Sequence, residues 1–444
     1  MIITPLMQHQ YDALMYLKAH DPCALFMRQG IGKSLVALTY AHEIKAKCIL
    51  ITSDKTNIVQ TWPEQIEAHT DATYVVRPTK ETYEGATFVL VNYDYLPSCQ
   101  WLRGVPFDLW IGDESSEFKD GRTRRHKHLD AIVHKIPHRI ILNGTPLTEQ
   151  AEDLWGQFKI LDGGLALGSC ISHFRSRFMQ LDRLGYNWNL KRSGMTRIQR
   201  AIKERSYWHD GKGITMPTRK YHRVTVNMTD KQRELDDELK KWYAAEFQRS
   251  RIEVKHAAVL FIKRIQLMGG IFRPTISPEK ESQQASQRVT TNKLDVLNLV
   301  IARNKKNKIV VWHEYIPETE LLHDTLKGGG YNLWVYDDSS DVTPLIKFQE
   351  AKSGVLLIRN SFCKGLNALA DGDIAVIWSN PLSYRDRSQL LGRTCRMSSK
   401  TRETHVVDII TKGGADEIVY NMLSQKQSFV LTTARLRSIV EEHK

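Results

Sequence analysis

The stretch LFMRQGIGKSLVAL, residues 25–38, decides how the rest of this chain is interpreted. Its centre, Gly-Ile-Gly-Lys-Ser at 30–34, is typical of a phosphate-binding loop, because glycines allow a tight turn that points backbone N–H groups at phosphate. In such a loop Lys33 pairs with the terminal phosphates and the Ser34 hydroxyl holds magnesium. The strict pattern has a glycine where Met27 stands, so the loop by itself is a moderate signal.

Apolar runs around the loop and near the end of the chain predict two parallel sheets. In both regions short apolar runs alternate with helical patterns, which is typical of repeated strand–helix units. Between about 156 and 290 the chain is polar, basic and mostly helical in pattern, with one strand-like piece at 220–229 and a polar linker at 277–293. The expected strands of the two sheets lie within 23–27, 47–53, 87–93, 109–115, 139–146, 307–315, 331–337, 354–361, 374–381 and 404–411.

The net charge of this 444-residue chain is +13, which favours a polyanionic partner, most often nucleic acid. A basic surface without a partner is the alternative. None of the six cysteines forms a CxxC pair, so we expect no metal or disulfide framework and a reducing compartment. No signal-peptide pattern opens the chain and no run of about 18 apolar residues occurs. We therefore expect a cytoplasmic protein of a bacterium or a virus-infected cell, or a nuclear one if the source is eukaryotic.

An acid pair ends one of the predicted strands, in LWIGDESSEFKD at 109–120. A sheet that hydrolyses nucleotide needs such a pair, with Asp113 to hold magnesium and Glu114 to orient and deprotonate the attacking water. A strand that ends in solvated carboxylates is the alternative. The combination with the glycine loop favours the functional interpretation.

Two arginines near the end of the chain stand three residues apart in SQLLGRTCRMSS, 388–399. On a helix Arg393 and Arg396 would share one face and could stabilise the charge on a transferred phosphate as arginine fingers. Two ordinary surface arginines are the alternative on a basic protein.

Nine segments of the chain, in order, resemble the motifs of the Swi/Snf-like ATPases of helicase superfamily two. In this family the position of Met27 does not have to be glycine. The DES form of the acid motif also resembles the fork-remodelling, strand-annealing branch. The matching segments are LMQHQYDAL (6–14), MRQGIGKS (27–34), CILITSDKTNIVQTWPEQIEAH (48–69), VLVNYDYL (89–96), GDESSEFKD (112–120), ILNGTPLTEQAEDLW (141–155), KIVVWHEY (308–315), KGLNAL (364–369) and QLLGRTCR (389–396).

The resemblance implies an α/β fold with two RecA-like parallel-sheet lobes, a helical insert between them and a C-terminal helix. It divides the chain into a first lobe at 1–158, helical protrusions and linker at 159–290, a second lobe at 291–415 and a helical brace at 416–444. ATP and Mg²⁺ would lie between the lobes. Double-stranded DNA is the expected partner of a monomer, with single-stranded or forked DNA as alternatives.

The resemblance also implies roles for individual residues. The residues expected to act in catalysis are Lys33, Asp113, Glu114, Gln389, Arg393 and Arg396. Magnesium is expected to be bound by Ser34 and Asp113. The residues expected to contact ATP are Gln10, Arg28, Gln29, Gly30, Ile31, Gly32, Lys33, Ser34 and Gly365. DNA contacts fall to Lys55, Tyr93, Lys119, Arg122, Arg124 and Asn367, with a core position for Tyr93 and a solvated loop for the arginines as the alternatives.

Three positions depart from the family pattern. Ser116 replaces a histidine, Phe362-Cys363 replaces two small residues, and Met397-Ser398 replaces Gly-Gln. The predicted function is ATP-driven translocation on double-stranded DNA. A strand-separating helicase, and a nucleic-acid-binding protein with an impaired ATPase, are the alternatives.

Overall fold

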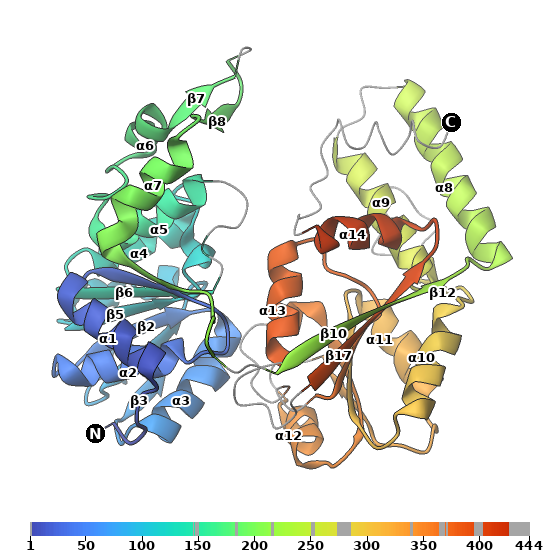
Figure 1. Cartoon of the computed structure of the whole chain (residues 1–444), viewed down its shortest axis with the longest axis horizontal. Helices are drawn as coiled ribbons and strands as arrows, with labels where there is room; N and C mark the ends of the chain where they lie inside the picture. The colour runs from blue at the N-terminus through green and yellow to red at the C-terminus, as the bar shows by residue number, and fades with distance from the viewer. Residues whose placement is uncertain are drawn as a thin grey trace. The chain divides into compact units, whose positions relative to one another are not determined.

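The computed structural model describes residues 2–144, 146, 151–182, 185–214, 217–249, 254–272, 286–337, 341–363, 369, 372–394 and 403–425. The chain divides into two compact units (Figure 1). Unit 1 comprises 1–215 with 364–366, and unit 2 comprises 216–363 with 367–444. Each unit contains its own parallel sheet and is described by itself.

The sheet of unit 1 has seven parallel strands in the order β3-β4-β2-β5-β6-β1-β9. Its central strands are continuous apolar runs because helices cover both faces of such a sheet. The strands are β1 Cys23–Met27, β2 Ile49–Ser53, β3 Tyr74–Val76, β4 Phe88–Asn92, β5 Leu109–Asp113, β6 His138–Asn143 and β9 Ser206–His209. The helices that accompany them are α1 Gln8–His20, α2 Lys33–Glu43, α3 Trp62–His69, α4 Arg124–Val133 and α5 Glu152–Asp162.

A small subdomain follows α5 in unit 1. Two helices, α6 Ile171–Phe178 and α7 Gly194–Ile202, enclose an antiparallel hairpin of β7 Met179–Leu181 and β8 Trp188–Leu190. The sequence predicted a mostly helical region here, and the hairpin is an addition to that prediction. Its two strands have only three residues each, so they leave almost no alternating pattern in the sequence.

The sheet of unit 2 has six parallel strands in the order β10-β17-β16-β13-β15-β14. They are β10 Thr218–Val226, β13 Lys308–His313, β14 Leu333–Tyr336, β15 Gly354–Arg359, β16 Ile374–Ile377 and β17 Glu403–Thr411. A short pair, β11 Ile271–Phe272 and β12 Gln287–Arg288, stands apart from the sheet. The helices are α8 Asp230–Arg249, α9 Val254–Met268, α10 Lys293–Arg303, α11 Ile316–Leu326, α12 Thr343–Glu350, α13 Tyr384–Thr394 and α14 Ala415–Ser424.

Two buried ion pairs fix helices of unit 2 to one another and to the sheet. The guanidinium of Arg387 on α13 donates two hydrogen bonds to the carboxylate of Asp408 on β17, at 2.8 and 2.7 Å. The ammonium of Lys293 on α10 lies 2.6 Å from the carboxylate of Asp416 on α14. All four side chains are almost completely buried, so each charge depends on its partner.

The predicted fold class is confirmed: the chain forms two α/β lobes, each with a parallel sheet, and every strand expected from the apolar runs is present. The boundaries of the four predicted segments stay predictions, and the segment 159–290 contributes to both units. Within the residues that the structure describes, no helix has both the length and the apolar character that a membrane crossing requires.

Candidate nucleotide-binding site

The glycine loop between β1 and α2 has the backbone shape that phosphate binding requires. Gly30 and Gly32 have φ angles of 80° and 87°, in the left-handed region that glycine adopts without strain. Gly32 is the N-cap of α2, so the loop leads directly into the N-terminal amides of that helix. A Cβ atom at Gly32 would lie 2.1 Å from Gln10 Nε2, so position 32 has no room for a side chain.

Two side chains of helix α1 contact the backbone of the loop. Gln10 Nε2 donates a hydrogen bond to the carbonyl oxygen of Ile31 at 3.2 Å, and the His9 ring nitrogen Nε2 lies 3.0 Å from the same oxygen. The ammonium of Lys33 reaches back to the carbonyl oxygen of Met27 at 3.0 Å. Met27 is the fully buried last residue of β1, so this position belongs to the sheet, and the positive-φ glycines that turn the loop come after it, at 30 and 32.

The acid pair stands at the end of β5. The Asp113 carboxylate accepts hydrogen bonds from Ser53 Oγ at 3.2 Å, Trp62 Nε1 at 3.1 Å and the backbone N–H of Glu114 at 2.9 Å. Burial and the neighbouring Glu114 raise the pKa of Asp113, and Lys33 opposes that rise, so the loop lysine and the acid pair lie within electrostatic reach. Glu114 is buried and has a φ of 51°, a strained backbone of the kind that clusters at functional sites.

Strand β6 lies between β1 and β5 in the sheet, and the residues at its end connect the glycine loop to the acid motif. Asn143 Nδ2 donates to Ser115 Oγ at 3.0 Å, and that hydroxyl donates to Gln157 Oε1 at 2.5 Å. A Cβ atom at Gly144 would lie 2.7 Å from Gln29 Cγ in the loop. The ends of three neighbouring strands therefore meet at one edge of the sheet.

The residues at this edge fit magnesium and a nucleoside triphosphate. Mg²⁺ is usually held by one or two protein oxygens together with substrate phosphates, which suits Ser34 at the start of α2 and the Asp113 carboxylate. The positive-φ glycines leave the loop amides accessible to phosphate. In the described residues, no group of three or more His, Cys, Asp or Glu side chains is arranged to hold a metal ion.

Tyr93 lies in the core of unit 1 and not on its surface. It is 2% exposed, and its hydroxyl donates to the carbonyl oxygens of Thr52 at 3.0 Å and Asp113 at 2.6 Å. The predicted DNA contact of Tyr93 is therefore replaced by the alternative, a buried tyrosine that braces the end of β5. Lys55 is exposed, as a DNA contact would require.

The cations after the acid motif have carboxylate partners. Lys119 Nζ lies 3.1 Å from the Asp153 carboxylate, and Arg122 lies 2.9 Å from that of Asp120. Arg124 is exposed at the start of α4.

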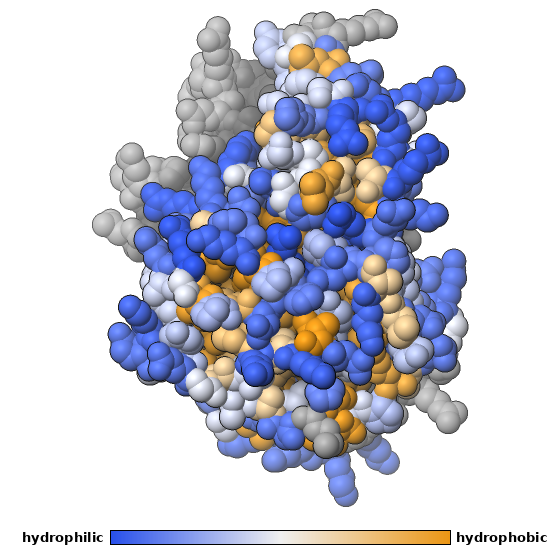
Figure 2. Space-filling model, turned by 90° about the vertical axis from the view of Figure 1, so that its left-hand side faces the viewer, coloured by the Kyte–Doolittle hydropathy of each residue, from blue (hydrophilic) through white to orange (hydrophobic). Residues whose placement is uncertain are grey.

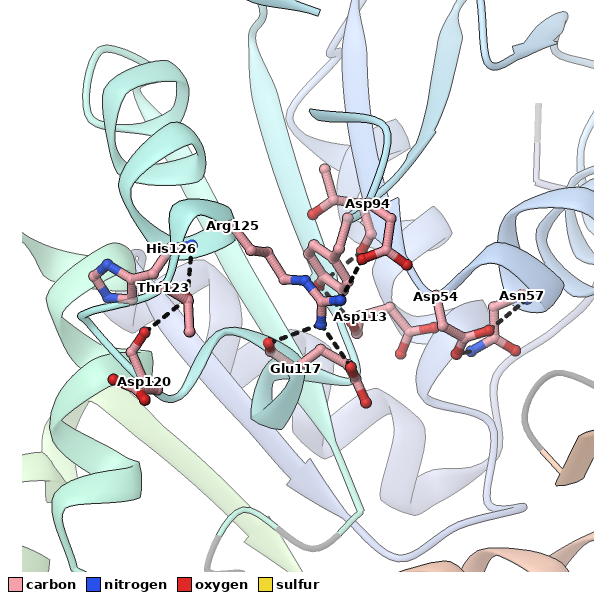
Figure 3. Close-up of polar contacts among 11 residues, drawn as sticks. Asp54, Asn57, Asp94, Asp113, Glu117, Asp120, Thr123, Arg125 and His126 are labelled. Carbon is pink, nitrogen blue, oxygen red and sulfur yellow. Dashed lines mark hydrogen bonds and ion pairs between the residues drawn. The ribbon is translucent and has the colours of Figure 1, made fainter. Parts of the chain in front are cut away.

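Arg125, next in the chain, has two carboxylate partners. It pairs with Glu117 at 2.7 Å and also contacts Asp94. Figure 3 shows its guanidinium between these two carboxylates. The partners of these cations come from distant parts of the chain or from the same loop. The sequence therefore shows the positive charges but not the carboxylates that pair with them.

The residues predicted to act from the second lobe lie on α13 of unit 2. Gln389 and Arg393 are both largely buried, with exposures of 1% and 9% in the whole chain. Their catalytic roles stay predictions. Outside the described residues lie Gly365, Asn367 and Arg396, together with Thr145 and the Met397-Ser398 departure.

Sequence reasoning missed several residues that build the site. Ser53 ends β2 at the same sheet edge as Asp113, so its position was available from the parallel strand pattern. Ser115 lies within the acid motif, but the motif does not show its buried link to Gln157. Gln157 lies on α5, forty-two residues away, and no local pattern marks it.

Comparisons with known proteins show which proteins this chain is similar to. The model of the SNF2-related domain matches residues 18–267. The chain is 24% identical over 443 residues to protein p41 of Acyrthosiphon pisum secondary endosymbiont phage 1, covering 90% of this chain and 91% of that one. It is 22% identical over 462 residues to the uncharacterized ATP-dependent helicase YqhH of Bacillus subtilis, covering 95% and 78%. The solved SWI2/SNF2 ATPase core of Sulfolobus solfataricus in complex with dsDNA is 18% identical, with a TM-score of 0.46 and coverage of 95% and 91%.

Proposed function

The chain belongs to the SNF2-related domain family, and on that premise we propose that it is a motor that hydrolyses ATP and moves along double-stranded DNA. The observation that carries the proposal is the meeting of Lys33, Asp113 and Glu114 at one edge of the first sheet, with a glycine loop shaped for phosphate. The net charge of +13 supports a nucleic-acid partner, and the name of YqhH describes an ATP-dependent helicase.

Each residue of this edge has a definite task. Lys33 exchanges its contact with the Met27 carbonyl for the β- and γ-phosphates, and the loop amides orient them. Ser34 and Asp113 would hold a magnesium ion, which would supply positive charge to the phosphates when bound. Glu114 accepts the proton of the attacking water. Phosphoryl transfer depends mainly on positioning and charge, which these groups of unit 1 would supply. The arginine-finger roles expected for Arg393 and Arg396 stay predictions.

Two other functions use the same site. A strand-separating helicase needs, in addition, an element that parts the two strands. A binding protein with an impaired ATPase would need a defect in the catalytic groups, and Lys33, Asp113 and Glu114 are all in place, which favours an active enzyme.

Phosphate release with and without DNA tests the proposal. Wild-type protein should hydrolyse ATP faster with duplex DNA than with single strands of equal length, and the stimulation should fall steeply with salt. Lys33→Ala should abolish hydrolysis. Glu114→Gln should bind ATP normally and not hydrolyse it. Lys305→Ala, at an exposed lysine of unit 2, serves as the control and should behave as wild type. Equal stimulation by single strands would favour the helicase, and normal turnover of Lys33→Ala would refute the site.

A further inference from the structure

The subdomain of α6, β7, β8 and α7, with the turn that follows, carries much of the positive charge of the chain. We call residues 171–205 the basic hairpin subdomain. It contains nine Lys or Arg residues and two Asp or Glu residues, so 35 residues hold +7 of the total of +13. None of the nucleotide-site residues lies in it. This charge therefore needs an explanation of its own.

The basic hairpin subdomain is packed rigidly onto unit 1. Phe174, Phe178, Ile198 and Ile202 are buried in the same core cluster as the strands of the first sheet. The hydroxyl of Tyr16 on α1 also donates to the backbone carbonyl at the end of α7 at 2.5 Å. Because the subdomain and the sheet share one close-packed core, we expect the subdomain to move together with unit 1 and with any DNA that it binds.

Tyr186, two residues before β8, presents its aromatic ring to solvent. The carboxylate of Asp182 accepts hydrogen bonds from the backbone N–H of Tyr186 at 2.9 Å and from the side-chain amide of Asn187 at 2.8 Å. Tyr186 is nevertheless 82% exposed. Figure 1 shows β7 and β8 projecting away from the sheet of unit 1. A ring this exposed offers its face to a stacking partner.

Basic side chains surround the base of this hairpin. Arg192, Arg197 and Arg200 are exposed on and beside α7, and no carboxylate in the described part of the chain lies within ion-pair distance of them. By contrast, Arg175 pairs with Glu152 at 2.8 Å. In Figure 2, which faces unit 1, hydrophilic side chains project from the upper part of the surface between small apolar patches. The combination of unpaired arginines and a ring is typical of a nucleic-acid surface.

Resting on the proposed function, we propose that the basic hairpin subdomain binds the junction between duplex and single-stranded DNA. The arginines of α7 contact phosphates, and Tyr186 stacks on the base pair or unpaired base at the junction. The interior of a duplex offers no open base face to a ring, whereas a fork does. The hairpin thereby gives the motor an element that senses a fork.

DNA binding and DNA-stimulated ATP hydrolysis on two substrates test this proposal. One substrate is a fluorescent forked oligonucleotide, and the other is a closed circular duplex, which has no end or fork. Tyr186→Ala should weaken binding to the fork about tenfold, the usual scale for one stacked base, and leave the ATPase on the circle unchanged. Tyr186→Phe should behave as wild type. Tyr221→Ala, at another exposed tyrosine on β10 of unit 2, is the matched control.

Charge reversal tests the arginines separately. Arg192→Glu with Arg197→Glu should weaken binding to both substrates and lower the slope of log affinity against log salt by about two. Lys305→Glu with Lys306→Glu makes the same change of charge on an exposed segment of unit 2 and should have a smaller effect. Circular dichroism melting establishes that every variant is folded.

The outcomes separate this proposal from the proposed function. If neither DNA stimulates the wild-type ATPase, the motor function is wrong. If the circle stimulates it but Tyr186→Ala binds the fork as tightly as wild type, only the junction proposal is wrong. If reversal at Arg192 and Arg197 changes DNA affinity no more than the lysine control does, the surface serves a protein partner and the junction proposal is overturned.

Discussion

Residues 119–125 and residues 171–205 are both basic stretches of unit 1, but their cations have different neighbours. In the first stretch, Lys119, Arg122 and Arg125 each pair with a carboxylate. In the second, Arg175 and Arg205 are paired. However, Arg192, Arg197 and Arg200 are exposed, and no carboxylate of the described residues lies within ion-pair distance of them. A paired cation is held in place by the protein and contributes to its stability, whereas an unpaired one attracts an external anion. A DNA surface is therefore indicated by exposed cations that have no carboxylate partner in the fold.

The strongest test of the paired class is Arg387, because its pair with Asp408 is buried in unit 2. Arg387→Ala leaves the Asp408 carboxylate buried without its cation and should destabilise unit 2 by about 3–5 kcal/mol. Urea unfolding followed by circular dichroism measures the loss. The double change Arg387→Met with Asp408→Leu removes both charges and should recover much of it. A double variant as unstable as the single one would show that packing, not charge pairing, is responsible.

Glu318 extends the comparison to a buried carboxyl that has no salt bridge in the described residues. It accepts hydrogen bonds from Ser379 Oγ at 2.7 Å and the backbone N–H of Tyr315 at 3.0 Å, and burial raises its pKa to about 7. The folded state therefore binds the proton more tightly than the unfolded state, whose pKa is about 4.3. Stability should fall as pH rises from about 4 to 7, by up to about 3 kcal/mol.

Glu318→Gln removes this titration and should flatten the dependence of stability on pH. The variant should gain about 1–3 kcal/mol over wild type at pH 8 and little at pH 4.5. Parallel unfolding curves at the two pH values provide the measurement. An equal difference between variant and wild type at both values would mean that folding does not raise the pKa of Glu318.

The smallest expected effect is at Arg125, whose partners Glu117 and Asp94 are partly exposed. Arg125→Ala should cost about 1 kcal/mol of stability, since solvent screens such pairs and the contact with the Tyr93 ring adds only a little. Its affinity for DNA and the salt slope should match wild type. A clear loss of DNA affinity at constant stability would contradict the comparison and return the segment 119–125 to the DNA surface.

Local sequence predicted the parts of the site that depend on local geometry. The glycine loop, Lys33 and the Asp113-Glu114 pair follow from turns and strand ends, and parallel strands bring such ends to one edge. Partners that are distant in the chain could not be predicted, such as Asp153 for Lys119 and Gln157 for Ser115. The burial of Tyr93 likewise depends on which elements pack over β4 and β5, and the short strands of the hairpin are held by packing rather than by their own pattern.

The closeness of Gln10 and Gly32 has a consequence for variation in this family. A side chain at position 32 would displace the amide of Gln10, and a shorter residue at position 10 would leave the Ile31 carbonyl oxygen with only its contact to His9. Gly32 is therefore constrained twice, by its own φ of 87° and by the side chain of Gln10 packed against it, although twenty-two residues separate the two positions. Loss of the glutamine alone would still leave position 32 restricted to glycine, so an engineered library should vary position 10 and keep the glycine.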